Sequence, residues 1–308
     1  MATKTTKAAT PSSSGTAART AAGLAPLALA LLLQQSVLPG GSTPPPATGT
    51  LQPAVCADDI GDFRTCHTDY PTGCTKAGRY DAALNLLKNQ LTPPATPPVQ
   101  FLGQTDVASL ESKLPKGLSK SNHGSFTDAL AQLGEGHVYG VHGYLYYAQK
   151  GGTSESSNCQ LGDIDAIDFH IGIGFDPAVA AKLLAKKAGT GKLTDDENAS
   201  LNKTSMIVEM TPHYRFQFKP DWTLPAVQAV VGHQVRVTGL LLVDNEHFEA
   251  KDDCAFSQAA SCWRATVWEL HPVTQFQFCN STAPCADDSP NWVDIGEKTT
   301  PPKLTTEE

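Results

Sequence analysis

Residues 224–231, LPAVQAVV, closed by Gly232, decide the fold through their place in the order of segments. A short apolar run followed directly by glycine is typical of a short helix that ends at the glycine. The segments around it are rich in Val, Ile, Tyr, Phe and Thr, which predicts strands. Three strands precede the helix and two follow it, over residues 137–148, 167–175, 206–211, 234–243 and 264–278. The sequence therefore predicts a mainly β domain.

Three strands, a short helix and two strands is an order that resembles the OB-fold, a five-stranded, partly open Greek-key barrel. The strings DFHIGIGF, IVEMTPHYR, VRVTGLLLVDNEHF and RATVWELHPVT, all within residues 136–280, are similar to those of OB-fold-like domains in exported bacterial proteins of unassigned function. This resemblance implies a fold and no activity. It also implies that strand two pairs with strand three, and strand three with strand five. Residues 176–204 depart from the pattern as a helical insertion, which could cover one end of the barrel.

The N-terminal part has the layout of an exported protein. Residues 21–33, AAGLAPLALALLL, form an apolar run of 13 after a basic segment without acids, which is typical of a secretory signal. An organelle transit peptide is the alternative. A membrane span needs about 20 apolar residues, so we expect none in the mature chain. We expect a signal peptide over 1–42, a Pro-rich linker over 43–54, a partly helical, Cys-containing extension over 55–135, the barrel over 136–280 and a tail over 281–308.

Cysteine spacing indicates disulfides and an oxidising compartment, either secreted or periplasmic. An even number of cysteines in an exported chain is typical of disulfide bonding, and no CxxC or CxxH pair indicates zinc. Local pairing would join Cys254 with Cys262 and Cys279 with Cys285, and the other four would pair among themselves. The eight are Cys56, Cys66, Cys74, Cys159, Cys254, Cys262, Cys279 and Cys285. The fold class predicted is a five-stranded OB-fold-like Greek-key barrel with short helices and a disulfide-stapled N-terminal extension.

The charge distribution argues against nucleic acid as a partner. The chain has 23 basic and 31 acidic residues, a net charge of −8. Three of the basic residues, Lys4, Lys7 and Arg19, precede the first acidic residue, Asp58, so the remainder carries 20 basic against 31 acidic residues, or −11. Such a body repels phosphate backbones. The 40% hydrophobic content is enough for a core, and 18% charged residues is too few for a coiled coil.

Polar residues alternate with apolar ones along strands two, three and five. Side chains two apart share a face of a strand, so the polar members could converge on one outer face of the barrel if the registers allow. These candidates for general acid and base catalysis are Asp168, His170, Glu209, Glu269 and His271. Four of them, His170, Glu209, Glu269 and His271, are candidate ligands of Zn²⁺ or Mn²⁺. His213, Asp244 and His247 could join from the rim. We favour a solvated polar outer face held by structural hydrogen bonds over such a functional cluster, because no spaced ligand motif fixes a geometry.

Other clusters give weaker indications. Tyr144, Tyr146, Tyr147, Tyr214, Phe216 and Trp222 could stack bases or sugars, with core packing as the alternative. The acidic loop 244–261 lacks the spacing of an EF-hand, so a solvated loop is favoured over calcium binding.

From these observations we expect an exported, non-catalytic binding module that recognises a protein, peptide or glycan ligand and requires no cofactor. The first alternative is a metal-dependent hydrolase that uses the Asp/Glu/His cluster and a divalent transition metal. The second is binding of single-stranded nucleic acid, which the acidic body disfavours.

Overall fold

The computed structural model describes residues 84, 87–91, 100–120, 122–152, 155–158, 164–248, 252–255, 261–296 and 300–302. The expected signal peptide and linker lie outside the described residues, as do Cys56, Cys66, Cys74 and Cys159. All described residues belong to one unit, which spans residues 50–308.

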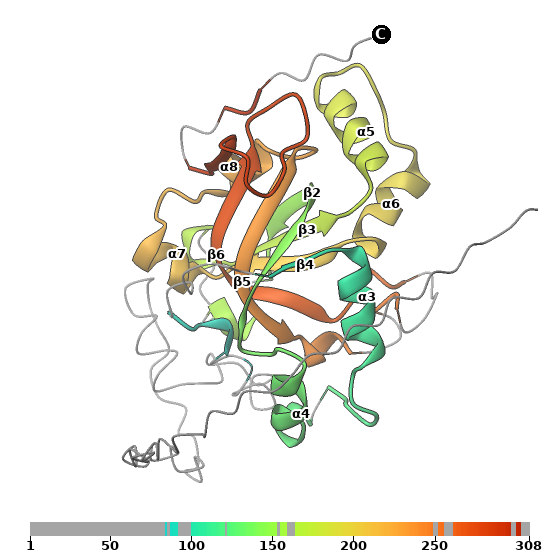
Figure 1. Ribbon diagram of the computed structural model, residues 1–308, viewed down its shortest axis with the longest axis vertical. Helices are drawn as coiled ribbons and strands as arrows, with labels where there is room; N and C mark the ends of the chain where they lie inside the picture. Colours follow the sequence, from blue (N-terminus) through green and yellow to red (C-terminus); the bar gives the residue numbers. More distant parts are fainter. Residues whose placement is uncertain are drawn as a thin grey trace, which may run out of the picture. The chain divides into compact units, whose positions relative to one another are not determined.

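The fold is mainly β, and its centre is a closed five-stranded barrel of mixed direction (Figure 1). The strands run in the order β2-β3-β4-β6-β5, and β5 pairs back with β2 to close the barrel. All these pairs are antiparallel except β4 with β6, which is parallel. The expected pairing of the second strand with the third, and of the third with the fifth, is confirmed. The bounds are β2 Val138–Lys150, β3 Phe169–Gly174, β4 Met206–Met210, β5 Gln234–Val243 and β6 Trp268–Cys279.

The alternation along the strands fills the barrel as the sequence predicts. Phe169, Ile171 and Ile173 of β3 lie in the main apolar core, with Met206, Val208 and Met210 of β4. Trp268 and Leu270 bring β6 into the same core. The residues between them must therefore point outward, which places the acidic and histidine side chains of these strands on the outer face of the barrel.

Two short strands lie outside the five-strand ring. β1 (Phe101–Leu102) pairs in parallel with β2, and β7 (Trp292–Asp294) pairs antiparallel with β6. The sequence analysis predicts neither strand. It treats the first as part of the extension and the second as part of the tail, whereas both join the sheet.

The helices are short, and several begin where the sequence predicts. Asp176 caps α5 by accepting a hydrogen bond from the backbone N–H of Ala178, and Thr194 and Glu197 form the expected capping box of α6. α7, with Pro at its start, is not predicted. The bounds are α3 Gln104–Ser112, α4 Thr127–Gln132, α5 Pro177–Lys187, α6 Asp195–Lys203, α7 Pro212–Phe218 and α8 Leu224–Gln228.

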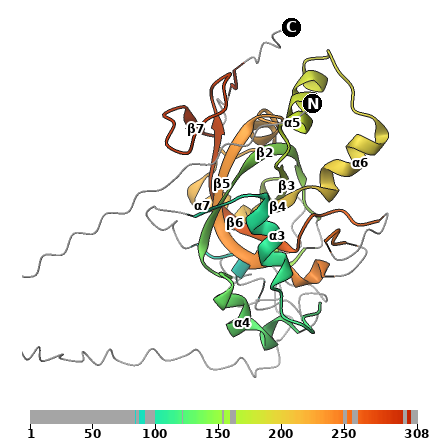
Figure 2. The same ribbon diagram turned by 45° about the vertical axis from the view of Figure 1, so that its right-hand side comes forward.

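The insertion between β3 and β4 packs on the outside of the barrel. Figure 2 shows α5 and α6 beside the ends of β2 and β3. Leu183 of α5 and Leu201 of α6 share an apolar cluster with Tyr146 of β2. Tyr146 is thus buried beneath this insertion, while Tyr144 and Tyr147 are half-buried against it.

Two disulfides are present in the described residues, and both have the expected local pairing. Cys254 is bonded to Cys262, and Cys279 to Cys285. Such bonds are compatible with an extracellular or other oxidising compartment. None of the helices in the described part of the chain combines the length and apolar character that crossing a bilayer requires.

The first prediction concerns Gly239, where the pairing of β5 with β6 is irregular: the register shifts on both sides of this residue. A Cβ atom at this position would lie 2.6 Å from the carbonyl oxygen of Pro272. Since backbone cannot yield as a side chain can, we expect Gly239→Ala to lower the free energy of unfolding by about 1–3 kcal/mol. Gly124→Ala is the control, because no atom lies within 4 Å of its added Cβ. Equal urea midpoints for the two variants would contradict the prediction.

Candidate functional site

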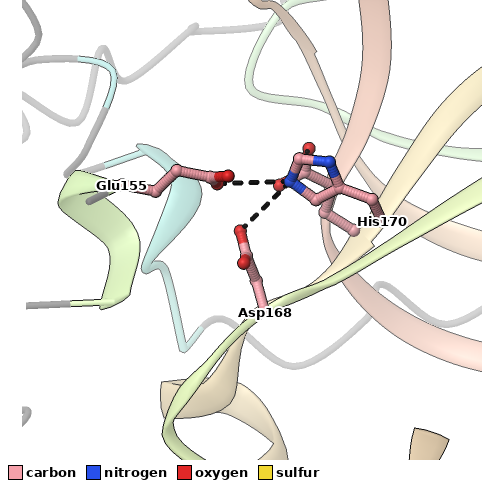
Figure 3. Close-up of side chains that lie close together, drawn as sticks. Glu155, Asp168 and His170 are labelled. Atoms are coloured by element: carbon pink, nitrogen blue, oxygen red, sulfur yellow. Dashed lines mark hydrogen bonds and ion pairs between the residues drawn. The ribbon is translucent and has the colours of Figure 1, made fainter. Parts of the chain in front are cut away.

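Four side chains meet on the outer face of β3 and β4, and we call them the His170 cluster: Glu155, Asp168, His170 and Glu209. The Nε2 atom of His170 lies 3.2 Å from Oε2 of Glu155, 3.2 Å from Oε1 of Glu209 and 3.6 Å from Oδ2 of Asp168. Figure 3 shows the Glu155, Asp168 and His170 side chains pointing toward one another. The antiparallel register sets His170 directly opposite Glu209, so the two outward side chains are neighbours.

The loop that follows β2 holds Asp168 in place. The hydroxyl of Ser157 donates to Oδ2 of Asp168 at 3.2 Å, and Nδ2 of Asn158 donates to Oδ1 at 2.9 Å. The backbone N–H of Asp168 donates in return to Oδ1 of Asn158. Gly151 closes the same site, because a Cβ there would lie 2.0 Å from Oδ1 of Asp168 and 3.0 Å from Nε2 of His170. A glycine is therefore required where the chain passes the cluster.

Burial and mutual charge shift the protonation of the His170 cluster. Burial alone would raise the pKa of Asp168, but its interactions with His170 and its hydrogen bonds hold that pKa well below the usual range. Burial opposes the charged form of His170, yet the charge of Glu209 and the contacts with Asp168 and Glu155 raise its pKa well above the usual value. Burial, and next the charge of Asp168, raises the pKa of Glu155 to about 7.

A second group of buried charges adjoins the first, and we call it the Arg264 network. Arg264 donates from Nη1 to Oδ2 of Asp244 and from Nη2 to Oε2 of Glu269, both at 2.8 Å. Nζ of Lys88 lies 3.7 Å from Oε1 of Glu269 and 3.9 Å from Oδ1 of Asp244. His247 contacts Oδ2 of Asp244 at 2.6 Å. Two cations and a histidine thus surround two carboxylates.

Glu209 and His271 connect the two groups. The parallel register pairs Ile207 with Glu269, and continued by two residues it sets Glu209 beside His271. Nδ1 of His271 lies 3.0 Å from Oε2 of Glu209 and 3.3 Å from Oε1 of Glu269. Burial opposes the charge on His271, but Glu209 outweighs it and raises the pKa to about 9. Nε2 of His271 is buried and makes no hydrogen bond.

The five sequence-predicted site residues converge, so the condition on the registers is met. The expectation of a solvated outer face is wrong: Asp168, Glu269 and His271 are each 0% exposed and Glu209 is 3% exposed. The segment 87–91 helps to cover this face, since the backbone carbonyl of Lys88 accepts a hydrogen bond from Thr211 and its side chain enters the Arg264 network. The sequence pattern of a sheet face covered by another segment is the same as that of a face exposed to water.

The rim candidates divide. Asp244 and His247 lie in the Arg264 network, whereas His213 lies buried on α7. The acidic loop is not simply solvated, because Asp244 and Asp253 are buried.

The aromatic candidates are mostly packed inside. Tyr146, Tyr214 and Trp222 are buried, so stacking of bases on them is ruled out, while Phe216 is 50% exposed.

Sequence reasoning missed Glu155, Lys88 and Arg264. Glu155 lies in a loop and Lys88 far away in the chain, so strand alternation says nothing of either. The sequence did hold a signal for Arg264: it lies four residues before the start of β6, and buried carboxylates need a buried cation.

Two groups of the described residues on this face could hold a metal ion, and they are its chemically distinctive feature. Glu155, Asp168, His170 and Glu209 form one such group, and Glu209, Glu269 and His271 form another. Glu269 is already bonded to Arg264, so the first group is the better candidate. Its carboxylate and imidazole ligands suit Zn²⁺ or Mn²⁺.

Arg264 is the source of the second prediction. Arg264→Met leaves Asp244 and Glu269 buried with their main cation removed, so we expect a loss of about 3–5 kcal/mol in the free energy of unfolding. Arg236→Met is the matched control, since Arg236 is partly exposed and its loss should cost about 1 kcal/mol or less. Urea unfolding at pH 7 measures both, and a loss no larger than that of the control would contradict the role assigned to Arg264.

The third prediction concerns the loss of stability in acid that Asp244 causes. Burial would raise the pKa of Asp244, but His247, Lys88 and Arg264 hold it well below its usual value of 3.8. Below that value the unfolded chain binds a proton that the folded chain does not, so stability falls as pH falls. We expect Asp244→Asn to flatten the slope of unfolding free energy against pH between about pH 4 and 2. The exposed Asp128→Asn serves as control, and parallel slopes for Asp244→Asn and wild type would refute the assignment.

Comparisons of this chain with protein-family models, with curated proteins and with solved structures find no match. A fold by itself does not determine function. The function therefore has to be argued from the His170 cluster and its surroundings.

Proposed function

We propose that this protein is an exported, non-catalytic binding module built on an OB-fold-like Greek-key barrel, and that its ligand is a divalent transition metal ion held by the His170 cluster. The barrel assignment is supported by the strand order, by the parallel pairing of β4 with β6 and by α8 ahead of β5. Export is supported by the apolar run at 21–33 and by the two disulfides.

The observation that carries the proposal is the position of one imidazole nitrogen among three carboxylates. Its distances to Glu155, Glu209 and Asp168 are 3.2, 3.2 and 3.6 Å. In a tetrahedral zinc site with bonds of about 2.0–2.1 Å, neighbouring ligand atoms are about 3.4 Å apart. All four candidate ligand atoms lie within 4.8 Å of one another. The side chains already have nearly the spacing that a metal ion imposes.

The balance of charge also favours a cation. A protonated imidazole offers one N–H at Nε2, which cannot satisfy three carboxylates at once. Asp168 has other donors in Ser157 and Asn158, but those are neutral. Lys88 and Arg264, the buried cations of the neighbouring network, contact Asp244 and Glu269, and His271 divides its Nδ1 between Glu209 and Glu269. A divalent ion in place of the imidazole proton supplies the missing positive charge where it is most needed.

An ion can reach the cluster from solvent. The side chain of Glu155 is 29% exposed and that of His170 is 13% exposed, while Asp168 and Glu209 are buried. The site therefore has two ligands at the surface and two beneath them, an arrangement that allows entry and still limits hydration.

This cluster is the reason for naming a metal rather than the protein, peptide or glycan ligand expected from sequence. A metal-dependent hydrolase is the second candidate. The observation that favours it is the partly exposed Glu155, which in a hydrolase would be the general base, leaving Asp168, His170 and Glu209 to hold the metal.

The fourth prediction is a metal content. After incubation with ZnCl₂ and gel filtration, the purified protein should carry about one zinc ion per chain, as measured by plasma mass spectrometry. His170→Ala and Glu209→Gln should reduce the zinc to background because each removes a ligand. Glu155→Gln, at a partly exposed position with little risk to folding, should weaken zinc affinity in calorimetry.

His137→Ala is the control, because His137 is exposed and lies outside the cluster. Equal zinc in wild type and His170→Ala would overturn the proposal. Zinc-dependent hydrolysis of p-nitrophenyl acetate or bis(p-nitrophenyl) phosphate, lost in His170→Ala, would replace the non-catalytic function with the hydrolase.

A further inference from the structure

A cavity of about 610 Å³ lies between α3, the start of β4, and Ala255, Ala265 and Thr266 ahead of β6. That volume is within the range of small-molecule sites, about 300–1,000 Å³. Its apolar wall includes Val107, Ala108, Phe175 and Met206. Ala108 is exposed, so the cavity opens to solvent. No lining residue belongs to the His170 cluster or the Arg264 network.

One carboxylate faces this apolar wall. Oε2 of Glu111 accepts hydrogen bonds from the hydroxyl of Thr266 and, at 3.3 Å, from the backbone N–H of Val267. Oε1 of Glu111 is buried and accepts no hydrogen bond from an N–H or hydroxyl donor, and the Glu111 carboxyl adjoins the carboxyl of Asp253. Two adjoining buried carboxyls must share a proton or hold a cation between them, and a ligand that supplies a cationic donor there takes the place of the shared proton.

The surroundings of Glu111 are negative rather than neutral. Asp253 is fully buried, directly precedes the disulfide-bonded Cys254, and acts on Glu111 through its charge and a side-chain hydrogen bond. Burial, and next the charge of Asp253, raises the pKa of Glu111 to about 7. The polar end of the cavity thus attracts a cation that can donate hydrogen bonds.

We propose that this cavity binds a small molecule with a primary ammonium group on an apolar chain, the ammonium contacting Glu111 and the chain lying along the wall formed by Val107, Phe175 and Met206. An ammonium group has three donors and a full positive charge, so it satisfies Oε1 of Glu111 and offsets Asp253. The apolar chain gains from burial in the same cavity. The groups that could hold a metal among the described residues lie elsewhere, which favours an organic cation.

The fifth prediction tests this with three probes of one chain length: hexylamine, 1-hexanol and hexanoate. In calorimetry at pH 7.5 the purified protein should bind hexylamine about tenfold or more tightly than 1-hexanol, because a hydrogen bond to a charged group is worth at least that factor. Hexanoate should not bind. Glu111→Gln should remove the preference for the amine and leave the weak binding of the alcohol.

Two further variants keep the test decisive. Ala108→Trp fills the cavity mouth from an exposed position and should abolish binding of both probes even if Glu111→Gln folds poorly. Asp128→Asn makes the same change of acid to amide on α4 and should leave hexylamine binding unchanged. Equal affinity for amine and alcohol, absence of any binding, or tight hexanoate binding that Lys203→Met abolishes would each overturn the proposal, since Lys203 is a base on the cavity wall.

Discussion

The carboxylate of Glu209 is shared by two imidazoles: Oε1 lies 3.2 Å from Nε2 of His170 and Oε2 lies 3.0 Å from Nδ1 of His271. This contact depends on β4 lying between β3 and β6, antiparallel to one and parallel to the other. If the register slipped by one residue on either side, Glu209 would exchange faces with an apolar neighbour. The buried charges therefore favour the observed strand register over a register slipped by one residue.

Burial makes this arrangement demanding. Charged groups inside a protein must be paired, since the loss of solvation exceeds what a single weak contact returns. The Arg264 network meets that requirement with Arg264 and Lys88 against Asp244 and Glu269. The His170 cluster is less fully paired, because its three carboxylates face His170 and only a share of His271, which also contacts Glu269. This difference separates a group of structural ion pairs from a group that we expect to bind a cation.

Much of the barrel could be predicted from sequence because its determinants are local. The alternation in β3 and β6 separates core residues from outward ones, and the apolar helix α8 fixes the strand order. α7 was missed, although Thr211 followed by Pro212 is a helix-start signal. The site was predictable only in part. Strand periodicity identifies Asp168, His170 and Glu209, but it cannot tell that a distant segment covers them.

The covering of this face also explains why the wrong expectation was the natural one. A polar stripe on a strand looks the same whether water or another segment lies over it. What distinguishes the two is a set of partners from elsewhere in the chain, here Lys88 and Glu155, and these contacts are non-local. The alternation of residues along a strand thus predicts which side chains share a face. Whether that face is exposed to solvent depends on contacts with segments elsewhere in the chain.

The loop closed by Cys254 and Cys262 links this buried chemistry to the compartment in which the protein folds. The backbone N–H of Cys254 donates to the carbonyl of Arg264, so the disulfide-closed loop fixes the backbone from which Arg264 reaches Asp244 and Glu269. Asp253, the residue before Cys254, acts on Glu111 at the cavity. A reducing environment breaks the Cys254–Cys262 disulfide but leaves the buried carboxylates of Asp244 and Glu269. Noncovalent contacts alone would then hold Arg264 beside them. This arrangement of charges is compatible with an oxidising compartment, in which the disulfide persists.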